Sequence, residues 1–448
     1  MNLLNVIRGF DTELYDYYEE ELERQYYSLS FIPDENSMSP LCAATLGNVL
    51  VNEEHNNTFS STNILEEIVT KRICSIFNCE HANVKCITIE AASRVVLQAL
   101  VQRGDVVMSL DLRKKEHCNS ESFVYRFVNF GLNPETQHLN YDAIEAQAQE
   151  NKPRLIIVSP INYPYPIDYE RLSKIATDVG AILWCDISQV AGLITSGVMA
   201  SPLPYADVVT FTTHGALQGP RSAVIISKYK YASAIDRVAF ASGHTGLGSP
   251  ELAAMAIRLK KMQSPEYRDY CDQAIKNAQA LAEGLKEGGM TLICGGTESH
   301  LVVIDAKHCA MSARGAIDNL ADCGIVARNC KVYTQDPAVK FDAVRFSSLP
   351  ATTREINPED MKKLGVAIAH FLGNPNTEHE EKLNDLVRNI TILLPLFSSR
   401  WLTPIEQENL ANQLAFLGRS DSTTASRHRL GRLMRNVLRK GKDDDASE

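Results

Sequence analysis

The sequence predicts an α/β protein, with a mainly parallel sheet covered by helices on both faces and a smaller α+β domain towards the C-terminus. Short apolar runs alternate with segments of helical periodicity through the middle of the chain, as they do in α/β domains. Several of these runs are apolar on both faces, which is typical of strands buried between two layers of helices. With 448 residues, 44% of them apolar, the chain is long enough for two or three domains with separate cores.

The expected elements begin near residue 64. Helices are predicted over 64–77 and over 168–179, where Gly180 ends the second one. Strands are predicted over 106–111, 155–159, 181–186, 208–213 and 223–227. After Pro250 the pattern predicts a long helical region, strands over 291–294, 301–305 and 344–347, and helices over 313–321 and 358–371.

These elements divide the chain into four parts: an N-terminal arm (1–63), a large domain (64–250), a small α+β domain (251–373) and a helical C-terminal extension (374–448). The extension ends in a basic amphipathic helix over 426–440, where Leu430, Leu433 and Val437 recur three to four residues apart between arginines. We interpret this helix as a solvated or partner-docking face. Contact with nucleic acid or with an anionic membrane is the alternative.

Composition excludes several classes of protein. A formal net charge of -10 argues against a surface built to follow nucleic acid. The eleven cysteines are scattered without a C-x-x-C pair, so we expect free core thiols and no metal site or disulfide framework. The apolar stretch over 390–397 is too short for a membrane span, and the N-terminus resembles neither a signal nor a transit peptide. The expected protein is soluble and cytoplasmic.

Candidate ligand-binding residues follow two of the predicted strands. Asp186 closes an apolar strand and would lie at the carboxyl end of a parallel sheet, where open α/β folds bind their ligands. Thr212, Thr213 and His214 end another strand, and a Gly-Pro-Arg turn at Arg221 comes shortly after them. The combination is more specific than any of these residues by itself.

Three motifs carry a family resemblance. Residues 34–40 read Asp-Glu-Asn-Ser-Met-Ser-Pro, residues 184–193 read Trp-Cys-Asp-Ile-Ser-Gln-Val-Ala-Gly-Leu, and residues 207–221 contain Thr-Thr-His-Gly-Ala-Leu-Gln-Gly-Pro-Arg. They resemble Ser-Glu-Asn-x-x-Ser-Pro, Val-Asp-x-Ala-His-Val-Ala-Gly-Leu and Thr-Thr-Thr-His-Lys-Thr-Leu-x-Gly-Pro-Arg of the serine hydroxymethyltransferase family. The resemblance covers most of the chain. It implies the fold of type I pyridoxal-phosphate (PLP)-dependent transferases, with a seven-stranded, mainly parallel sheet.

The resemblance also implies roles for individual residues. Asp186 would pair with the pyridine nitrogen of PLP, and Arg345 would bind the carboxylate of the amino-acid substrate. The other cofactor-site positions that it implies are Thr88, Ser120, Thr212, His214 and Arg221. A purely structural role stays open for each residue, for example a strand-end cap for Asp186 or a salt bridge for Arg345.

The sequence departs from the family at several of these positions. Gly215 stands where the lysine that forms the Schiff base should follow His214, and glycine cannot form an imine. Thr88-Ile89-Glu90 replaces the Ser-Gly-Ser of the phosphate cup, and we interpret Glu90 as a buried or interface group. Ser120 and Gln189 replace two histidines. A shorter segment over 53–62 replaces a loop rich in tyrosine and glycine, so that the loop's catalytic glutamate and tyrosines have no clear counterparts; Glu53 and Glu54 are the acidic residues that we place there.

These departures favour a protein that has kept the fold and lost the family's catalysis, with no catalytic residue, metal or cofactor assigned. Such a chain would be a regulatory, scaffold or binding subunit. Because the family's active site lies at a dimer interface, we expect a homodimer or a heterodimer with an active relative, and a protein partner for the C-terminal extension. The alternative is a divergent PLP-dependent enzyme that performs hydroxymethyl transfer or an aldol-type reaction on an amino acid.

Overall fold

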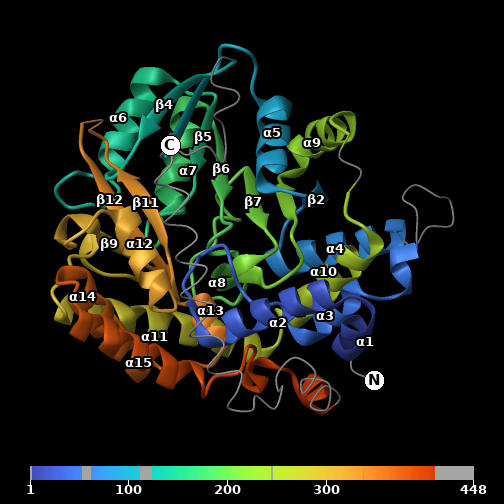
Figure 1. The fold of residues 1–448 in the computed structure, drawn as a ribbon. Coiled ribbons are helices and arrows are strands. Elements are labelled where there is room, and N and C mark those ends of the chain that lie inside the picture. The colour runs from blue at the N-terminus through green and yellow to red at the C-terminus, as the bar shows by residue number, and fades with distance from the viewer. Residues whose placement is uncertain (1–2, 53–61, 111–123, 244–245, 337, 409–448) are drawn as a thin grey trace, which may run out of the picture.

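The computed structural model describes residues 3–52, 62–110, 124–243, 246–336 and 338–408 (Figure 1). At its centre lies a seven-stranded sheet with the order β2-β8-β7-β6-β5-β3-β4. The strands are β2 (His81–Cys86), β3 (Val106–Leu110), β4 (Arg126–Phe130), β5 (Leu155–Val158), β6 (Ile182–Asp186), β7 (Val208–Thr212) and β8 (Ala223–Ser227). Strands β4, β3, β5, β6 and β7 pair in parallel, whereas β8 is antiparallel to both of its neighbours. The predicted mainly parallel sheet is confirmed.

Both faces of this sheet are covered by helices. Along β6, Leu183 and Cys185 contribute to one apolar core, and Ile182 and Trp184 contribute to another, as the two-residue period of a strand requires. Helices α5 (Ile89–Leu100) and α9 (Tyr229–Ala241) supply the second core. The first core draws on α4 (Thr62–Phe77), α6 (Tyr141–Asn151), α7 (Tyr169–Val179) and α8 (Ala191–Thr195). The expectation that strands apolar on both faces lie between helices is therefore confirmed.

A second, smaller sheet has the order β11-β12-β9 and is antiparallel. Its strands are β9 (Leu301–Asp305), β11 (Arg328–Tyr333) and β12 (Lys340–Ser347), and the helices around it are α11 (Pro265–Glu287), α12 (Ala313–Asp322) and α14 (Pro358–Gly373). These elements share an apolar core of their own. Helix α10 (Ser249–Lys261) precedes them, and its residues Leu252 and Met255 pack in the first core beside the large sheet. The predicted domain boundaries stay predictions.

Two details of this region differ from the sequence prediction. The strand predicted over 291–294 is wrong: the chain forms the 3-10 turn η4 (Ile293–Gly295), in which Cys294 has φ 60°, and only an isolated bridge joins Leu292 to Ile304. Left-handed backbone cannot continue a strand. Strand β11 was not predicted, because this edge strand exposes the polar residues Arg328, Asn329 and Lys331.

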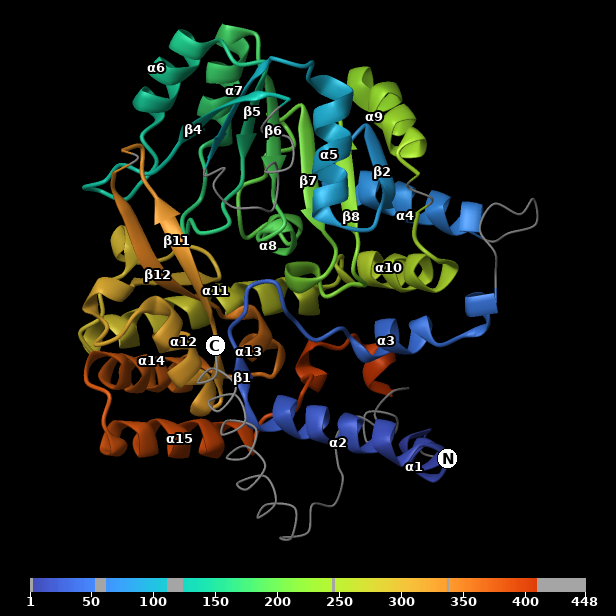
Figure 2. The ribbon, with the colours of Figure 1, turned by 45° about the horizontal axis from the view of Figure 1, so that its top comes forward.

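The N-terminal arm forms α1 (Leu3–Phe10), α2 (Thr12–Tyr27), the short strand β1 (Leu29–Ser30), α3 (Pro40–Leu46) and the 3-10 turn η1 (Val49–Asn52). Strand β1 pairs in parallel with β10 (Ile325–Val326), and the carbonyl of Phe31 accepts a 2.7 Å hydrogen bond from the amide of Ser347 in β12. From there the blue segment passes between the two sheets before it reaches α3 (Figure 2). The arm therefore runs directly past the carboxyl ends of the large sheet's strands.

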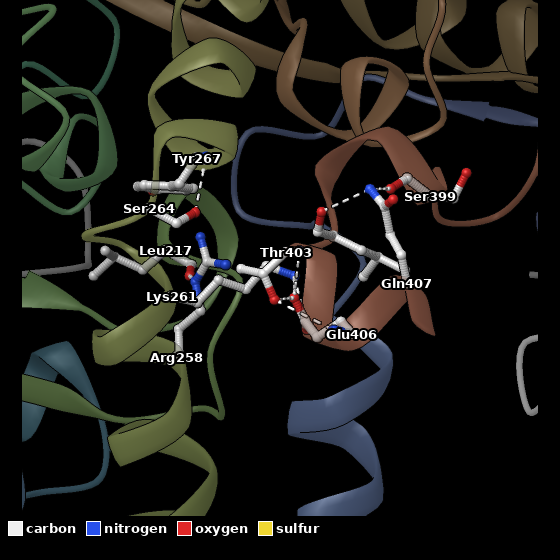
Figure 3. A network of polar contacts seen from close by, with 10 residues as sticks. Leu217, Arg258, Lys261, Ser264, Tyr267, Ser399, Thr403, Glu406 and Gln407 are labelled. Carbon is white, nitrogen blue, oxygen red and sulfur yellow. Dashed lines mark hydrogen bonds and ion pairs between the residues drawn. The ribbon is translucent and has the colours of Figure 1, made fainter. Parts of the chain in front are cut away.

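In the C-terminal segment, α15 (Thr377–Thr391) packs against α14 and α2, and the turn η6 (Ser399–Trp401) packs against α11. Arg354, which follows α13 (Leu349–Thr353), donates hydrogen bonds to the carbonyls of Ser28 and Pro395 and so ties the arm to this segment. A buried ion pair joins Lys261 of α10 to Glu406 (Figure 3). The basic helix predicted over 426–440 lies outside the described residues.

Within the described ranges, ten cysteines are free thiols, most of them buried. No helix in those ranges combines the length and the apolar composition that a bilayer-crossing segment needs.

Candidate functional site

The carboxyl ends of β6 and β7 bring two of the predicted site residues to one edge of the sheet. Asp186 is the last residue of β6 and is 1% exposed. Its Oδ1 accepts a 2.8 Å hydrogen bond from the amide of Ser188, whose hydroxyl accepts a 3.2 Å bond from the amide of Thr212. This short relay fixes the loop after β6 against the end of β7. The hydroxyl of Thr212 is half-buried at the same edge.

Gly215 opens the 3-10 turn η3 (Gly215–Leu217) immediately after β7, and its φ of +61° lies in the left-handed region. A Cβ atom built on Gly215 would lie 3.3 Å from the carbonyl oxygen of Asp34 and 3.4 Å from that of Pro33. The turn is buried. The backbone of the N-terminal arm therefore lies in tight contact with the position that a Cβ at residue 215 would take.

His214 precedes this turn and is half-buried. Burial lowers the pKa of its imidazole, and the guanidinium of Arg221 lowers this pKa further. Its Nδ1 atom has no hydrogen-bond partner among the described residues. Arg221 itself is exposed. His214 is therefore a neutral imidazole at neutral pH, with one ring nitrogen available.

The N-terminus of α5 lies where the resemblance places the phosphate cup. Thr88 caps this helix, because its hydroxyl accepts a 3.2 Å hydrogen bond from the amide of Ala91. Glu90 lies in the first turn, where a carboxylate is favoured by the positive end of the helix dipole. The interpretation of Glu90 as a buried group is wrong within this chain, because the residue is exposed. An interface role for Glu90 stays a prediction.

Arg345 projects from β12 and is 3% exposed. Its Nη1 donates to the carbonyl of Ile161 at 2.6 Å and to Oδ1 of Asn162 at 3.1 Å. Its Nη2 lies 3.5 Å from Oδ2 of Asp34, and its Nε has no hydrogen-bond partner in the described ranges. A buried guanidinium needs a counter-charge, and among the described residues the carboxylate of Asp34 supplies it.

Gln189 and His300 complete this cluster. The side-chain amide of Gln189 donates a 2.6 Å hydrogen bond to Oδ1 of Asp34, and the backbone carbonyl of Gln189 lies 2.7 Å from Nε2 of His300. Burial lowers the pKa of His300 to about 4, so this ring is neutral at pH 7. A carbonyl can only accept, and therefore Nε2 carries the proton while Nδ1 accepts from Ser347 at 2.9 Å.

The structure thus gathers Asp186, Thr212, His214 and Arg345 around the arm. Asp34 is the site residue that the sequence analysis missed, although an available signal was the acidic residue aligned with the first serine of the Ser-Glu-Asn motif. Ser120, Glu53 and Glu54 lie outside the described residues. No group of three or more His, Cys, Asp or Glu side chains in the described part is arranged to hold a metal ion.

Comparison with known families agrees with this geometry. The model of the family described as serine hydroxymethyltransferase matches residues 7–368. The chain belongs to the serine hydroxymethyltransferase family. Its seven-stranded sheet is accordingly the type I PLP fold, and serine hydroxymethyltransferases are typically oligomeric. The match ends inside α14, so α15 and the segment that carries Trp401 and Glu406 lie beyond it.

The residues of this family member meet only part of what PLP requires. Asp186 presents a buried carboxylate at the strand edge, as a partner for the pyridine nitrogen should. Residue 215 has no amine, and the backbone of Asp34 lies against it. The site therefore does not fit PLP held as a covalent imine at this position. The cofactor roles of Thr88, Thr212, His214 and Arg221 stay predictions.

Proposed function

We propose that the chain is a noncatalytic member of the serine hydroxymethyltransferase family that acts as a regulatory, scaffold or binding subunit. The observation that carries this proposal is Gly215, a buried left-handed glycine against the arm at the position aligned with the Schiff-base lysine. An imine requires a primary amine, and a glycine offers none. Without it the cofactor has no covalent anchor, and the exchange of one imine for another that admits an amino acid has no starting point.

Exposed apolar side chains support a role in association. Helix α2 has no buried residue, and Phe10 and Tyr17 on the N-terminal helices are 93% and 64% exposed. In the extension, Leu393 and Ile405 are 82% and 74% exposed. Contiguous exposed apolar patches mark protein contact surfaces, and these side chains are candidates for two such surfaces. A homodimer, or a heterodimer with an active relative in the cytoplasm, would cover the first surface, and a protein partner would cover the second.

A second candidate function is a divergent PLP-dependent enzyme that acts on an amino acid. The observation that favours it is the retention of Asp186 and Arg345 as buried side chains, together with the available nitrogen of His214. This enzyme would hold PLP without a covalent bond to residue 215. It therefore predicts turnover that depends on added cofactor.

Turnover of serine separates the two candidates. Purified full-length protein is incubated with L-serine and PLP, and glycine and the formaldehyde released with it by aldol cleavage are quantified against the same mixture without protein. The noncatalytic proposal predicts no glycine above the protein-free control. Glycine that rises in proportion to protein, and disappears in Arg345→Gln, would overturn the proposal and support the divergent enzyme.

A further inference from the structure

We propose that Asp34 is a built-in carboxylate that competes with amino-acid carboxylates for Arg345. This inference rests on the proposed function. It assigns a class of ligand to the site around Arg345 and gives a reason why that ligand would bind weakly. The ligand class is a small molecule with a free carboxylate. The carboxylate of Asp34 would then lie in the position beside Arg345 that the carboxylate of such a ligand would take.

The charges around Arg345 support this assignment. Arg345 is 3% exposed. Its guanidinium donates hydrogen bonds to two uncharged groups, the carbonyl of Ile161 and the side chain of Asn162. In the described ranges, Asp34 is the carboxylate within ion-pair distance of it, at 3.5 Å from Nη2. The Nε atom remains without a hydrogen-bond partner there. The arginine is thus neutralised by one carboxylate while part of its hydrogen-bonding capacity is unused, as expected where a planar carboxylate ligand could bind better.

Three departures from the family motifs meet at this point. Asp34 aligns with the serine of Ser-Glu-Asn, Gln189 with a histidine, and Gly215 with the lysine. In the structure Gln189 donates to the side chain of Asp34 at 2.6 Å, and the backbone of Asp34 lies 3.3 Å from where a Cβ of Gly215 would be. One of these replacements supplies the carboxylate, the second hydrogen-bonds it, and the third leaves room for its backbone. Asp34, Gln189 and Gly215 therefore form one contiguous group of replaced residues.

The arm holds Asp34 at this place through contacts on both sides of it. Before it, the carbonyl of Phe31 accepts from the amide of Ser347 at 2.7 Å. After it, the side chain of Asn36 donates to Tyr270 at 2.9 Å and accepts from Thr353 at 2.6 Å. A tethered group competes at a high effective concentration. The side chain of Asp34 is 36% exposed, so a free carboxylate can displace it at the expense of affinity.

The test measures binding of glycine and acetate, without PLP, to the full-length protein and its variants by calorimetry. Asp34→Ser restores the residue of the family motif, and Asp34→Asn keeps an acceptor for Gln189 while it removes the charge. Both variants are expected to bind acetate and glycine at least tenfold more tightly than the wild type does. Asp236→Ser, which removes a carboxylate that pairs with His81 elsewhere, is the matched control and should bind as the wild type does.

The double variant Asp34→Ser with Arg345→Gln distinguishes the competitor from a general charge effect. The gain in affinity is expected to vanish in it. Equal affinity of the wild type and both Asp34 variants would refute the inference, as would a gain that survives the loss of Arg345. If Asp34→Ser fails to fold, Asp34→Asn decides by the same criteria. Since PLP is absent, failure here leaves the serine-turnover result on the proposed function untouched.

Discussion

At the scale of single residues, the decisive feature is a backbone conformation. Gly215 combines a left-handed φ with the carbonyl oxygens of Pro33 and Asp34 at 3.4 Å and 3.3 Å from a built Cβ, so a side chain there meets both strain and crowding. Gly180, at the end of α7, shares the left-handed φ at +73° but has open space around its Cβ position. Comparison of Gly180 with Gly215 therefore separates the cost of left-handed backbone from the cost of crowding around the Cβ atom.

Alanine substitutions at these glycines should therefore differ. Gly180→Ala is expected to lower the free energy of unfolding by about 1 kcal/mol, the cost of left-handed backbone. Gly215→Ala is expected to lower the free energy of unfolding by about 1 kcal/mol more than Gly180→Ala does, because the arm must shift. Urea unfolding of the two variants measures this difference. Equal losses would show that the arm does not press on position 215.

His300 makes the free energy of unfolding depend on pH. Its folded pKa of about 4 lies below the ordinary value of 6.5, because burial disfavours the charged ring. The unfolded chain therefore binds more protons between these values, and stability is complete above about pH 6.5 and declines as the pH falls towards 4. The decline attributable to His300 amounts to about 3 kcal/mol at most. His300→Gln should flatten the curve of unfolding free energy in this window, whereas parallel curves for variant and wild type would contradict the assignment.

At the scale of elements, the segment beyond the family match is anchored by a buried ion pair. Lys261 and Glu406 are 5% and 4% exposed, and Nζ lies 3.0 Å from Oε1 and 2.9 Å from Oε2 (Figure 3). Arg258, one turn earlier on α10, is also buried, with its guanidinium 4.3 Å from the ring centre of Tyr267. Burial lowers the pKa of Lys261, and Glu406 opposes this effect. Glu406 therefore supplies the counter-charge for Lys261, whereas the guanidinium of Arg258 stacks on Tyr267 and donates to the carbonyl of Leu217.

Removal of that carboxylate should be costly. Glu406→Gln leaves the buried Lys261 without its counter-charge and is expected to lower the free energy of unfolding by about 3 kcal/mol or more. The double variant Lys261→Met with Glu406→Leu should recover most of this loss, because it removes the charges together. Denaturant unfolding tests both, with Glu378→Gln in an exposed pair on α15 as a control that should change nothing measurable. A double variant that is no more stable than Glu406→Gln would contradict this account.

The elements also show what sequence reasoning could and could not reach. Five strands of the large sheet (β3, β5, β6, β7 and β8) were predicted from their apolar runs, and Asp186 was placed because it ends one of them. The two edge strands, β2 and β4, were not predicted, because they carry charged and polar residues. Strand β11 was not predicted because this edge strand exposes charged residues. The turn at Cys294 was not predicted because a positive φ at a cysteine has no local sequence signature. Asp34 escaped because its partners, Gln189 and Arg345, are more than 150 residues away. Such pairs emerge only from tertiary structure.

At the scale of the whole molecule, the exposed apolar side chains of the N-terminal helices predict self-association. The wild type is expected to sediment as a dimer, and Phe10→Ser is expected to weaken this dimer at least tenfold. Phe240→Ser is the matched control, because Phe240 is 87% exposed on α9, away from these helices. Analytical ultracentrifugation over a concentration series gives both dissociation constants. A wild-type monomer at all concentrations, or equal effects of the two substitutions, would contradict the prediction.

A chain with glycine at position 215 should form no imine with PLP at the edge of the large sheet. Purified protein is mixed with PLP, the visible absorbance is followed, the mixture is reduced with borohydride, and any adduct is mapped by mass spectrometry. We expect no saturable spectral change and no adduct on a residue around Gly215. A stable, stoichiometric adduct on a single lysine near Asp186 and Arg345 would contradict this expectation and would direct attention to the divergent enzyme.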